Sequence, residues 1–96
     1  MFNSITGLPE NAVVFDTETT GFDPEAGDRI VEIGAIKILD GLPTKETYHI
    51  YINPGRSVPQ SAVEVHGLTG EFLSQFDPIE HVIQGFLDFV GDLPMI

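Results

Sequence analysis

The apolar positions in the first half of the chain follow a strand pattern. Residues 12–18 begin with an apolar run and predict a first strand, and the turn-rich TTGFDPEAGD follows. Residues 29–39, RIVEIGAIKIL, are rich in β-branched side chains and predict a second strand. After a turn at Asp40 to Pro43, residues 47–53, TYHIYIN, predict a third strand. Because both connections are short, the strands are expected to form an antiparallel meander.

The second half of the chain has a helical pattern. A short helix is predicted from Gln60 to Val65, with Gly67 closing it. The clearest helix comes next, because its apolar residues recur three and four positions apart. These residues are Ile79, Val82, Ile83, Phe86, Leu87 and Val90. Asp77 is the expected N-cap, Glu80 completes a capping-box-like pattern, and Gly91 is expected to end the helix. Together these elements predict one α/β domain.

The composition is that of a single globular domain. The 96 residues are enough for one core, and 42% hydrophobic with 20% charged residues is an ordinary balance. There is no Cys, so disulfides and thiolate chemistry are excluded. The first residues lack the pattern of a secretory signal, and no stretch approaches the roughly 20 apolar residues that span a bilayer. We therefore expect a cytoplasmic protein with no membrane partner.

The charge is the unusual feature. Fifteen acids face only Arg29, Lys37, Lys45 and Arg56, which gives a net charge of −11. Such a surface repels a phosphate backbone and disfavours unaided binding to duplex nucleic acid. A phosphate substrate is still compatible with it, because bound divalent cations reverse the local sign. We expect any such substrate to be delivered by a partner rather than captured by long-range attraction.

The string DTETTG, residues 16–21, carries the candidate chemistry. Residues i and i+2 of a strand share a face, with Cα atoms about 6.6 Å apart. Asp16 and Glu18 are therefore expected to project together from the end of the first strand. That separation suits a pair of divalent ions about 4 Å apart, and Mg²⁺ and Mn²⁺ prefer such oxygen ligands. Thr17 points the other way and offers its backbone N–H to the site. The alternative interpretation of the acid pair is a solvated turn.

FDTETTG resembles the first exonuclease motif of the DEDD superfamily of 3′→5′ exonucleases, and within it the proofreading epsilon subunits of bacterial DNA polymerase III. RIVEIGAIKI and VEVHGLTGEFL are similar to later segments of that family, so the resemblance runs from about Val13 to the last residue. It implies a ribonuclease-H-like exonuclease fold with sheet order 3-2-1-4-5. It also implies hydrolysis of the 3′-terminal phosphodiester of single-stranded DNA with two Mg²⁺ or Mn²⁺ ions, beside the catalytic subunit of a DNA polymerase.

The resemblance implies roles for particular residues. Asp16 would bridge both metal ions, and Glu18 would hold the ion that carries the attacking water. Thr17, Thr19 and Thr20 would meet the sugar of the terminal nucleotide. The residues that align with positions packing against its base or sugar are Phe22, Val65 and His66.

Each of these further residues has a structural alternative. Phe22 and Val65 could be core residues, since aromatic and aliphatic side chains usually serve packing. His66 could simply end the short helix. Glu32 aligns with an acid of the family, but a polar outward strand face explains it equally well. His49 has the character of an ordinary strand residue.

Two further motifs of the superfamily are absent from the 96 residues. Neither H-N-x-x-F-D, with the third acid, nor H-x-x-x-x-D, with the last acid and the base, is present. Two carboxylates offset only half the charge of two divalent ions, so weak metal binding and no efficient deprotonation of water are expected. We expect residues 1–96 to be the N-terminal portion of one truncated exonuclease domain, inactive alone. The alternatives are an exonuclease domain of another DNA-processing enzyme, an exoribonuclease, or a non-catalytic polymerase-binding or self-association module.

Self-association is expected on the same grounds. With the fourth strand cut off after Met95-Ile96, the strand that carries Val13 and Phe15 would become an apolar edge, which is a template for pairing with another chain. Part of the apolar face of the long helix would also lie exposed, including some of Ile79, Ile83, Phe86 and Val90. We expect a dimer or soluble aggregate despite the charge.

Overall fold

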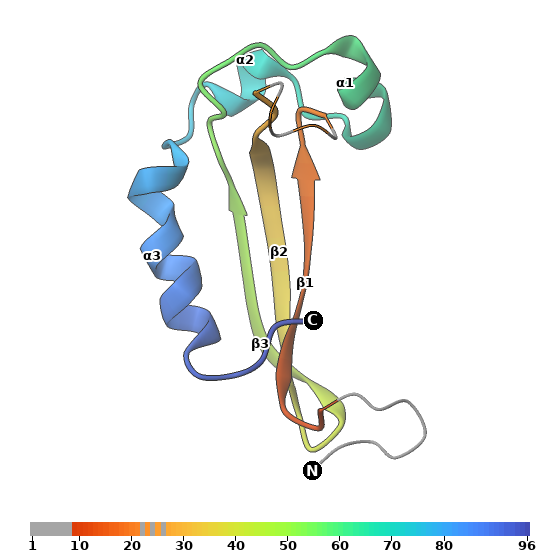
Figure 1. Cartoon of the computed structure of the whole chain (residues 1–96), viewed down its shortest axis with the longest axis vertical. Coiled ribbons are helices and arrows are strands. Elements are labelled where there is room, and N and C mark those ends of the chain that lie inside the picture. Colours follow the sequence, from red (N-terminus) through yellow and green to blue (C-terminus); the bar gives the residue numbers. More distant parts are fainter. Residues whose placement is uncertain (1–8, 22, 24, 26) are drawn as a thin grey trace.

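A computed structural model describes residues 9–21, 23, 25 and 27–96. Its three strands are β1 (Ala12–Thr19), β2 (Ile30–Leu39) and β3 (Leu42–Tyr51), which form one antiparallel sheet in that order. The helices are α1 (Gln60–His66), α2 (Gly70–Leu73) and α3 (Ile79–Val90). Figure 1 shows α3 running along the sheet on the side of β3, with α1 and α2 at the upper end. The predicted meander, short helix and long helix are confirmed.

The β2–β3 hairpin is tighter than predicted. Leu39 pairs with Leu42, so the turn consists of Asp40 and Gly41 alone. Both turn residues have positive φ, 53° and 77°. Two consecutive residues of this kind match the right-handed twist of the strands, which is why Asp-Gly forms two-residue hairpins.

The bounds predicted for the third strand are wrong as a consequence. β3 begins at Leu42 rather than Thr47, and it ends at Tyr51 rather than Asn53. The expected turn reached Pro43 because proline normally interrupts a sheet. β3 is an edge strand, however, where the missing N–H of proline is tolerated.

The start of α3 also differs from the prediction. Pro78, with an extended backbone, occupies the N-cap position, and no side chain caps the helix, so the expected capping by Asp77 is wrong. The backbone oxygen of Asp77 instead accepts a hydrogen bond from the N–H of Asn53 at 3.0 Å. This contact ties the start of α3 to the residues after β3. Gly91 ends the helix as expected.

The helix α2 was not predicted. It has only four residues, which is too short for a periodic pattern, and the Thr69 hydroxyl caps it by accepting from the N–H of Phe72 at 3.1 Å. Gly67 closes α1 in the left-handed conformation, as predicted, with φ of 75°. Among the residues that the structure describes, no helix is long and apolar enough to cross a bilayer.

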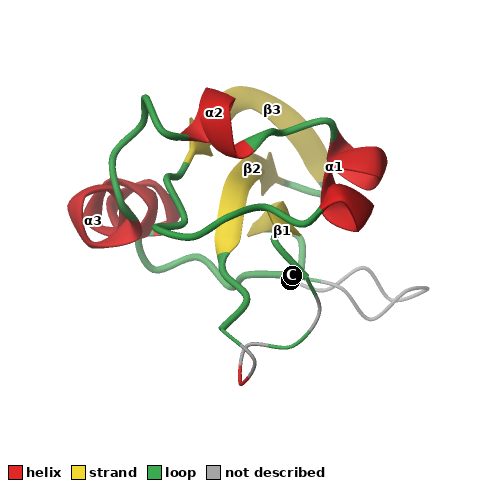
Figure 2. Cartoon of the chain, turned by 90° about the horizontal axis from the view of Figure 1, so that it is seen from above, coloured by secondary structure: helices red, strands yellow, loops and turns green. Residues whose placement is uncertain are grey.

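The main core lies between the sheet and α3. Its buried members are Val13, Ile33, Ala35, Ile52, Phe86 and Val90. The ring of Phe86 lies 6.1 Å from that of Phe15 and 5.9 Å from that of Tyr48, so one helix residue joins β1 to β3. Seen from above, α3 lies to one side of the curved sheet (Figure 2). Some of Ile79, Ile83, Phe86 and Val90 were expected to be exposed, but Phe86 and Val90 are only 6% and 5% exposed and the two isoleucines are half-buried.

A second, smaller core packs α2 and the residues on either side of α1 against the end of the sheet. Val31, Leu68 and Leu73 are its buried residues, with Tyr51 and Val58 packed against them. The register of β1 against β2 shifts between Glu18 and Thr19. Next to this irregularity, neighbouring residues of β2 serve different clusters, with Ile30 in the main core and Val31 in the second. The second core thus covers the end of the sheet beside the last residues of β1.

The last residues of the chain pair with β1 in parallel. The N–H groups of Val13 and Phe15 donate to the oxygens of Pro94 and Ile96, at 2.9 and 3.1 Å, and the N–H of Ile96 donates to Val13. A parallel neighbour on this side of β1 agrees with the expected sheet order. The expectation that the apolar half of β1 is an unpaired edge is wrong, because residues 94–96 already pair with it.

Candidate active site

Asp16 and Glu18 line one open groove at the end of β1. In the register, Asp16 lies opposite Gly34 and Glu18 lies opposite Glu32. The groove has a volume of about 120 Å³, and its walls are Asp16, Thr17, Glu18, Glu32 and Gly34. The absence of a side chain at Gly34 leaves the space beside Asp16 open. The two candidate carboxylates are therefore together and accessible.

The donor set in this groove suits a hard divalent cation but is incomplete. Within the described part of the chain, no Lys, Arg or His forms an ion pair with Asp16 or Glu18. Two carboxylates without a counter-charge attract a cation, and oxygen donors are those that Mg²⁺ and Mn²⁺ prefer. The described residues contain no group of three His, Cys, Asp or Glu side chains placed to hold a metal. Asp16 and Glu18 would supply two ligands, and the others must come from water or further groups.

The backbone N–H of Thr17 was expected to face the site, but its partner is the side chain of Asp16. This N–H donates to the Oδ1 atom of Asp16 at 2.9 Å. This hydrogen bond fixes the Asp16 carboxylate at the wall of the groove. The contact of Thr17 with a substrate sugar stays a prediction.

Glu32 and His49 form a pair beside the groove that the sequence did not reveal. Nε2 of His49 lies 2.5 Å from Oε2 of Glu32. This contact leaves open whether Glu32 serves the site or is a polar residue on an outward strand face. The pairing follows from the register of β2 and β3, in which His49 lies opposite Gly34, two residues from Glu32.

A second hollow, of about 130 Å³, adjoins the groove through Glu18. It is lined by Glu18, Thr19, Thr20, Gly21, Ser61, Ala62 and Val65. The structure thus brings together three of the predicted substrate residues, Thr19, Thr20 and Val65. Val65 is 74% exposed, so the alternative that it is a core residue is wrong. Ser61 and Ala62 were not predicted, although they lie four and three residues before Val65, on the same face of α1. Phe22 lies outside the described residues.

His66 connects α1 to the end of β1. Its Nδ1 accepts from the N–H of Leu68, and its Nε2 lies 3.0 Å from the oxygen of Thr19. Because Nδ1 is an acceptor here, Nε2 carries the proton and donates to Thr19. Both ring nitrogens therefore hold the backbone together around the hollow. The predicted contact of His66 with a nucleotide is not tested by this geometry.

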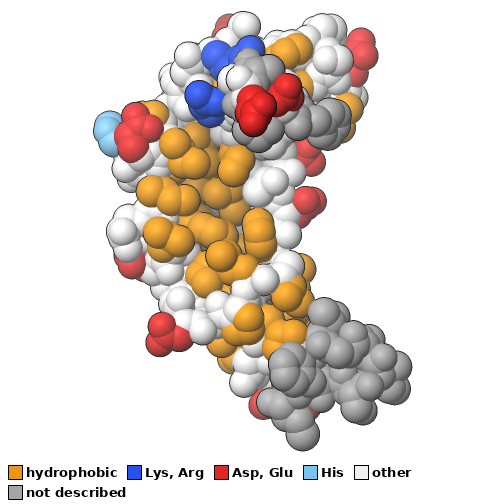
Figure 3. All heavy atoms as spheres, in the orientation of Figure 1, with side chains coloured by type: hydrophobic (Ala, Val, Ile, Leu, Met, Phe, Trp, Pro, Cys, Tyr) orange, Lys and Arg blue, Asp and Glu red, His pale blue; other side chains and the backbone are white. Residues whose placement is uncertain are grey.

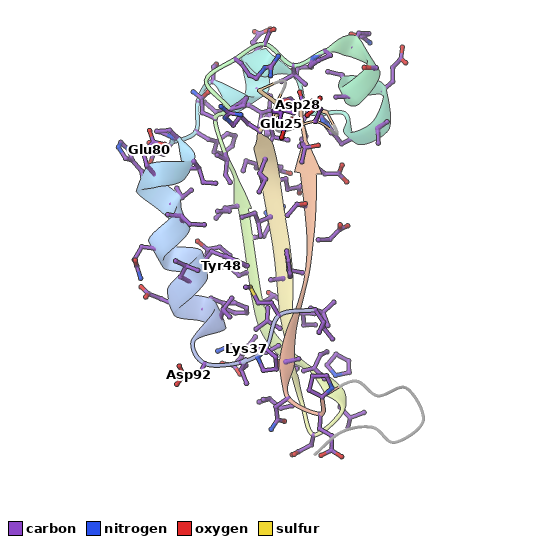
Figure 4. All side chains as sticks on the ribbon, viewed as in Figure 1. Glu25, Asp28, Lys37, Tyr48, Glu80 and Asp92 are labelled. Atoms are coloured by element: carbon purple, nitrogen blue, oxygen red, sulfur yellow. The ribbon has the colours of Figure 1, made fainter. Side chains whose placement is uncertain are left out.

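Asp28 organises the turn after β1. Thr20 is only 1% exposed, and its hydroxyl donates to Asp28 and accepts from the N–H of Arg29, each at 3.0 Å. The hydrogen bond from the backbone N–H of Asp23, and then that from Thr20, hold the pKa of Asp28 below its ordinary value of 3.8. Figure 4 shows Asp28 at the upper end of the sheet. A Cβ atom at Gly21 would collide with the Asp28 carboxylate, so a larger residue here would have to displace that side chain from its hydrogen bonds.

Comparison with known proteins adds to this picture. The sequence profile of the family described as exonuclease (RNase_T) matches residues 13–95. The DNA polymerase III subunit epsilon of Rickettsia felis is 47% identical over 85 residues, covering 88% of this chain and 37% of that protein. The PolC-type DNA polymerase III of Thermotoga petrophila is 47% identical over 83 residues, covering 84% of this chain and 6% of that protein.

A solved structure of exonuclease X in complex with 5′ overhanging duplex DNA has a similar fold. The TM-score is 0.68 at 27% identity, over 78% of this chain and 42% of that chain. The expected α/β exonuclease fold is therefore confirmed. The chain spans little more than a third of the length of the epsilon subunit that it matches.

Proposed function

The chain belongs to the exonuclease family, and from this premise we propose that it supplies the first two catalytic carboxylates of a 3′→5′ exonuclease domain. Residues 1–96 form the N-terminal portion of that domain. The observation that carries the proposal is the position of Asp16 and Glu18, side by side in an open groove at the end of β1. The hollow that contains Thr19 and Val65 adjoins the groove and offers a place for the terminal nucleotide.

The proposed reaction is hydrolysis of the last phosphodiester at a DNA 3′ end. Bound Mg²⁺ or Mn²⁺ would generate the attacking hydroxide and offset the charge that develops on the phosphate. Asp16 and Glu18 would hold the metal, and the hydrogen bond from Thr17 keeps the Asp16 carboxylate in place. The segment from Thr17 to Thr20 would contact the terminal sugar, while Val65 and His66 would face its base or sugar.

The proposed setting is proofreading beside the catalytic subunit of a replicative DNA polymerase, in the cytoplasm. The similarity to subunits epsilon of DNA polymerase III supports this choice. The match to a PolC-type polymerase supports the alternative of an exonuclease domain within a larger DNA-processing enzyme. An exoribonuclease remains the other alternative, because DNA and RNA present the same phosphodiester to the metal.

A direct test joins Ile96 to the part of the Rickettsia felis subunit that follows its matched segment. We expect this fusion to shorten 5′-labelled single-stranded DNA from its 3′ end in the presence of Mg²⁺. Replacing Asp16 or Glu18 by Ala should lower the rate roughly a thousandfold or more, because each belongs to a unit that acts together. The matched control Asp92→Ala, at an exposed acid after α3, should leave the rate unchanged.

Two results would contradict the proposal. In the first, the fusion melts cooperatively and yet degrades no DNA. In the second, neither substitution changes the activity of the fusion. The 96-residue chain alone should release no nucleotides above background. Activity of that chain that disappears in Glu18→Ala would contradict this expectation and show that the missing groups come from elsewhere, such as a second chain.

Our second proposal is that the chain acts as a self-association module, which binds other copies of itself. Figure 3 shows a strip of apolar surface along one face of the molecule. Large apolar side chains with more than a third of their surface exposed include Phe15, Leu87, Met95 and Ile96. Burying them would favour association, by roughly 1.5–3 kcal/mol for each side chain fully buried, against a net charge of −11 that salt screens within about 8 Å. Sedimentation at micromolar concentration should show a species larger than the monomer, and a clean monomer would contradict this proposal.

A further inference from the structure

The groove contains a third carboxylate whose position needs an explanation. Glu32 lies directly opposite Glu18 in the β1–β2 pair, and both residues line the groove. Like charges that face each other across an antiparallel pair destabilise a sheet. We therefore expect a neighbouring group to offset the negative charge of Glu32.

His49 provides that offset through a diagonal contact. It lies opposite Gly34, while Glu32 lies opposite Tyr51. A Cβ atom at Gly34 would be 4.0 Å from Cδ2 of His49, an ordinary van der Waals distance, so the imidazole lies beside the glycine and leaves the space above it open. From there Nε2 reaches Oε2 of Glu32 at 2.5 Å.

A second contact fixes the imidazole. The ring of Tyr51 meets that of His49 edge to face, with centroids 4.8 Å apart and planes at 89°. Tyr51 in turn packs against Phe72 of α2, so the second core supports the pair. The Glu32 side chain is 25% exposed and that of His49 is 50% exposed. Glu32 is thus held in one orientation and still reaches the solvent of the groove.

Building on the proposed function, we propose that Glu32 is a positioning residue of the metal site and that His49 orients it. One carboxylate oxygen of Glu32 is engaged by His49, and the other is left to accept hydrogen bonds from water molecules on a divalent cation held by Asp16 and Glu18. An indirect role of this kind fits the described residues, in which no three side chains converge to ligate a metal directly. Partners of metal ligands in such outer positions typically change metal affinity 10–100-fold.

The test uses the 96-residue chain and Mn²⁺ alone, with binding followed by electron paramagnetic resonance of the free ion. We expect Glu32→Gln to weaken Mn²⁺ binding about tenfold. The matched control is Glu46→Gln, which removes one carboxylate from β3, 59% exposed and paired at 3.9 Å with Lys37. It should change the affinity less than about twofold, since an exposed charge away from the groove is largely screened by salt.

The His49 variants separate orientation from stability. His49→Phe removes the donor to Glu32 and should weaken Mn²⁺ binding, whereas His49→Gln keeps an amide donor and should recover most of the affinity. Mn²⁺ should also broaden the side-chain resonances of Glu32 together with those of Asp16 and Glu18, but not those of Glu46. A purely structural pair would lower the melting temperature without these effects.

The two proposals fail in different ways. If neither Asp16→Ala nor Glu18→Ala alters Mn²⁺ binding, the proposed metal site itself is wrong. If both abolish binding while folded Glu32→Gln binds like the wild type, only the inference about Glu32 is overturned. Should Glu32→Gln not fold, Glu32→Asp replaces it: broadening of the shortened side chain's resonances by Mn²⁺ supports the inference, and its absence rejects it.

Discussion

The two faces of the β1–β2 pair have opposite chemistry. Towards α3, Val13, Ile33 and Ala35 are at most 9% exposed and form the main core. On the groove side, Asp16 is exposed to solvent and Glu18 is half-buried. Because side chains alternate along a strand, one backbone serves both purposes. The packed face fixes the strands, and the strands fix the acids, so the site gains rigidity from residues that take no part in its chemistry.

The strongest test of this contrast is on the packed face. Phe86→Ala should destabilise the fold by about 3–5 kcal/mol, because it leaves a cavity between α3 and the rings of Phe15 and Tyr48. Leu87→Ala, one position along the same helix and 46% exposed, is the matched control and should cost less than about 1 kcal/mol. Urea unfolding followed by circular dichroism measures both. Equal losses would mean that the α3 face is not the main source of stability.

On the groove face the effect should appear in binding rather than in folding. Asp16→Ala should weaken Mn²⁺ binding by more than about tenfold, since a direct ligand counts for more than an outer partner. Its melting temperature should not fall, because the substitution relieves repulsion between neighbouring acids. Calorimetric Mn²⁺ titration beside a thermal melt tests both points, with Asp92→Ala as the control. Unchanged, site-independent binding in Asp16→Ala would remove Asp16 from the site.

The turn after β1 depends on the buried hydroxyl of Thr20. Thr20→Val keeps the shape of the side chain but removes the hydrogen bonds to Asp28 and from Arg29. We expect a loss of about 1–3 kcal/mol, the usual result of leaving buried polar groups unpaired. Thr47→Val, at an exposed position of β3, is the matched control and should be nearly neutral. If both variants melt alike, the turn is not held by Thr20.

The smallest expected effect is a pH dependence at the same turn. The pKa of Asp28 is lowered in the folded chain, so its ionised form stabilises the fold. That contribution is complete above the ordinary value of 3.8 and is lost as the pH falls below it towards the folded pKa. The difference in melting temperature between wild type and Asp28→Asn should therefore be largest near neutral pH and should shrink below about pH 4. A difference that is constant from pH 3 to pH 7 would contradict this assignment.

The sequence by itself determined the features that depend on near neighbours. The prediction of a strand over residues 12–18 was sufficient to place Asp16 and Glu18 on one face, because side chains in a strand alternate with a fixed period of two. The helix α3 was equally readable, since its apolar residues repeat at the helical period. Its first turn was not, because Pro78 rather than Asp77 takes the N-cap position and no side chain caps the helix.

Only the tertiary structure decided which distant residues meet at the site. Glu32 and His49 are 17 residues apart, and their contact depends on the register of β2 against β3, which the Asp-Gly turn and the register shift between Ile36 and Ile38 set together. Val65 faces the hollow because His66 bonds to Thr19, 47 residues earlier, and so holds α1 against the end of β1. The pairing of Ile96 with Val13 likewise replaced the expected open edge. Local periodicity says which face a side chain takes, but the register between strands and the docking of helices depend on contacts summed over the whole chain.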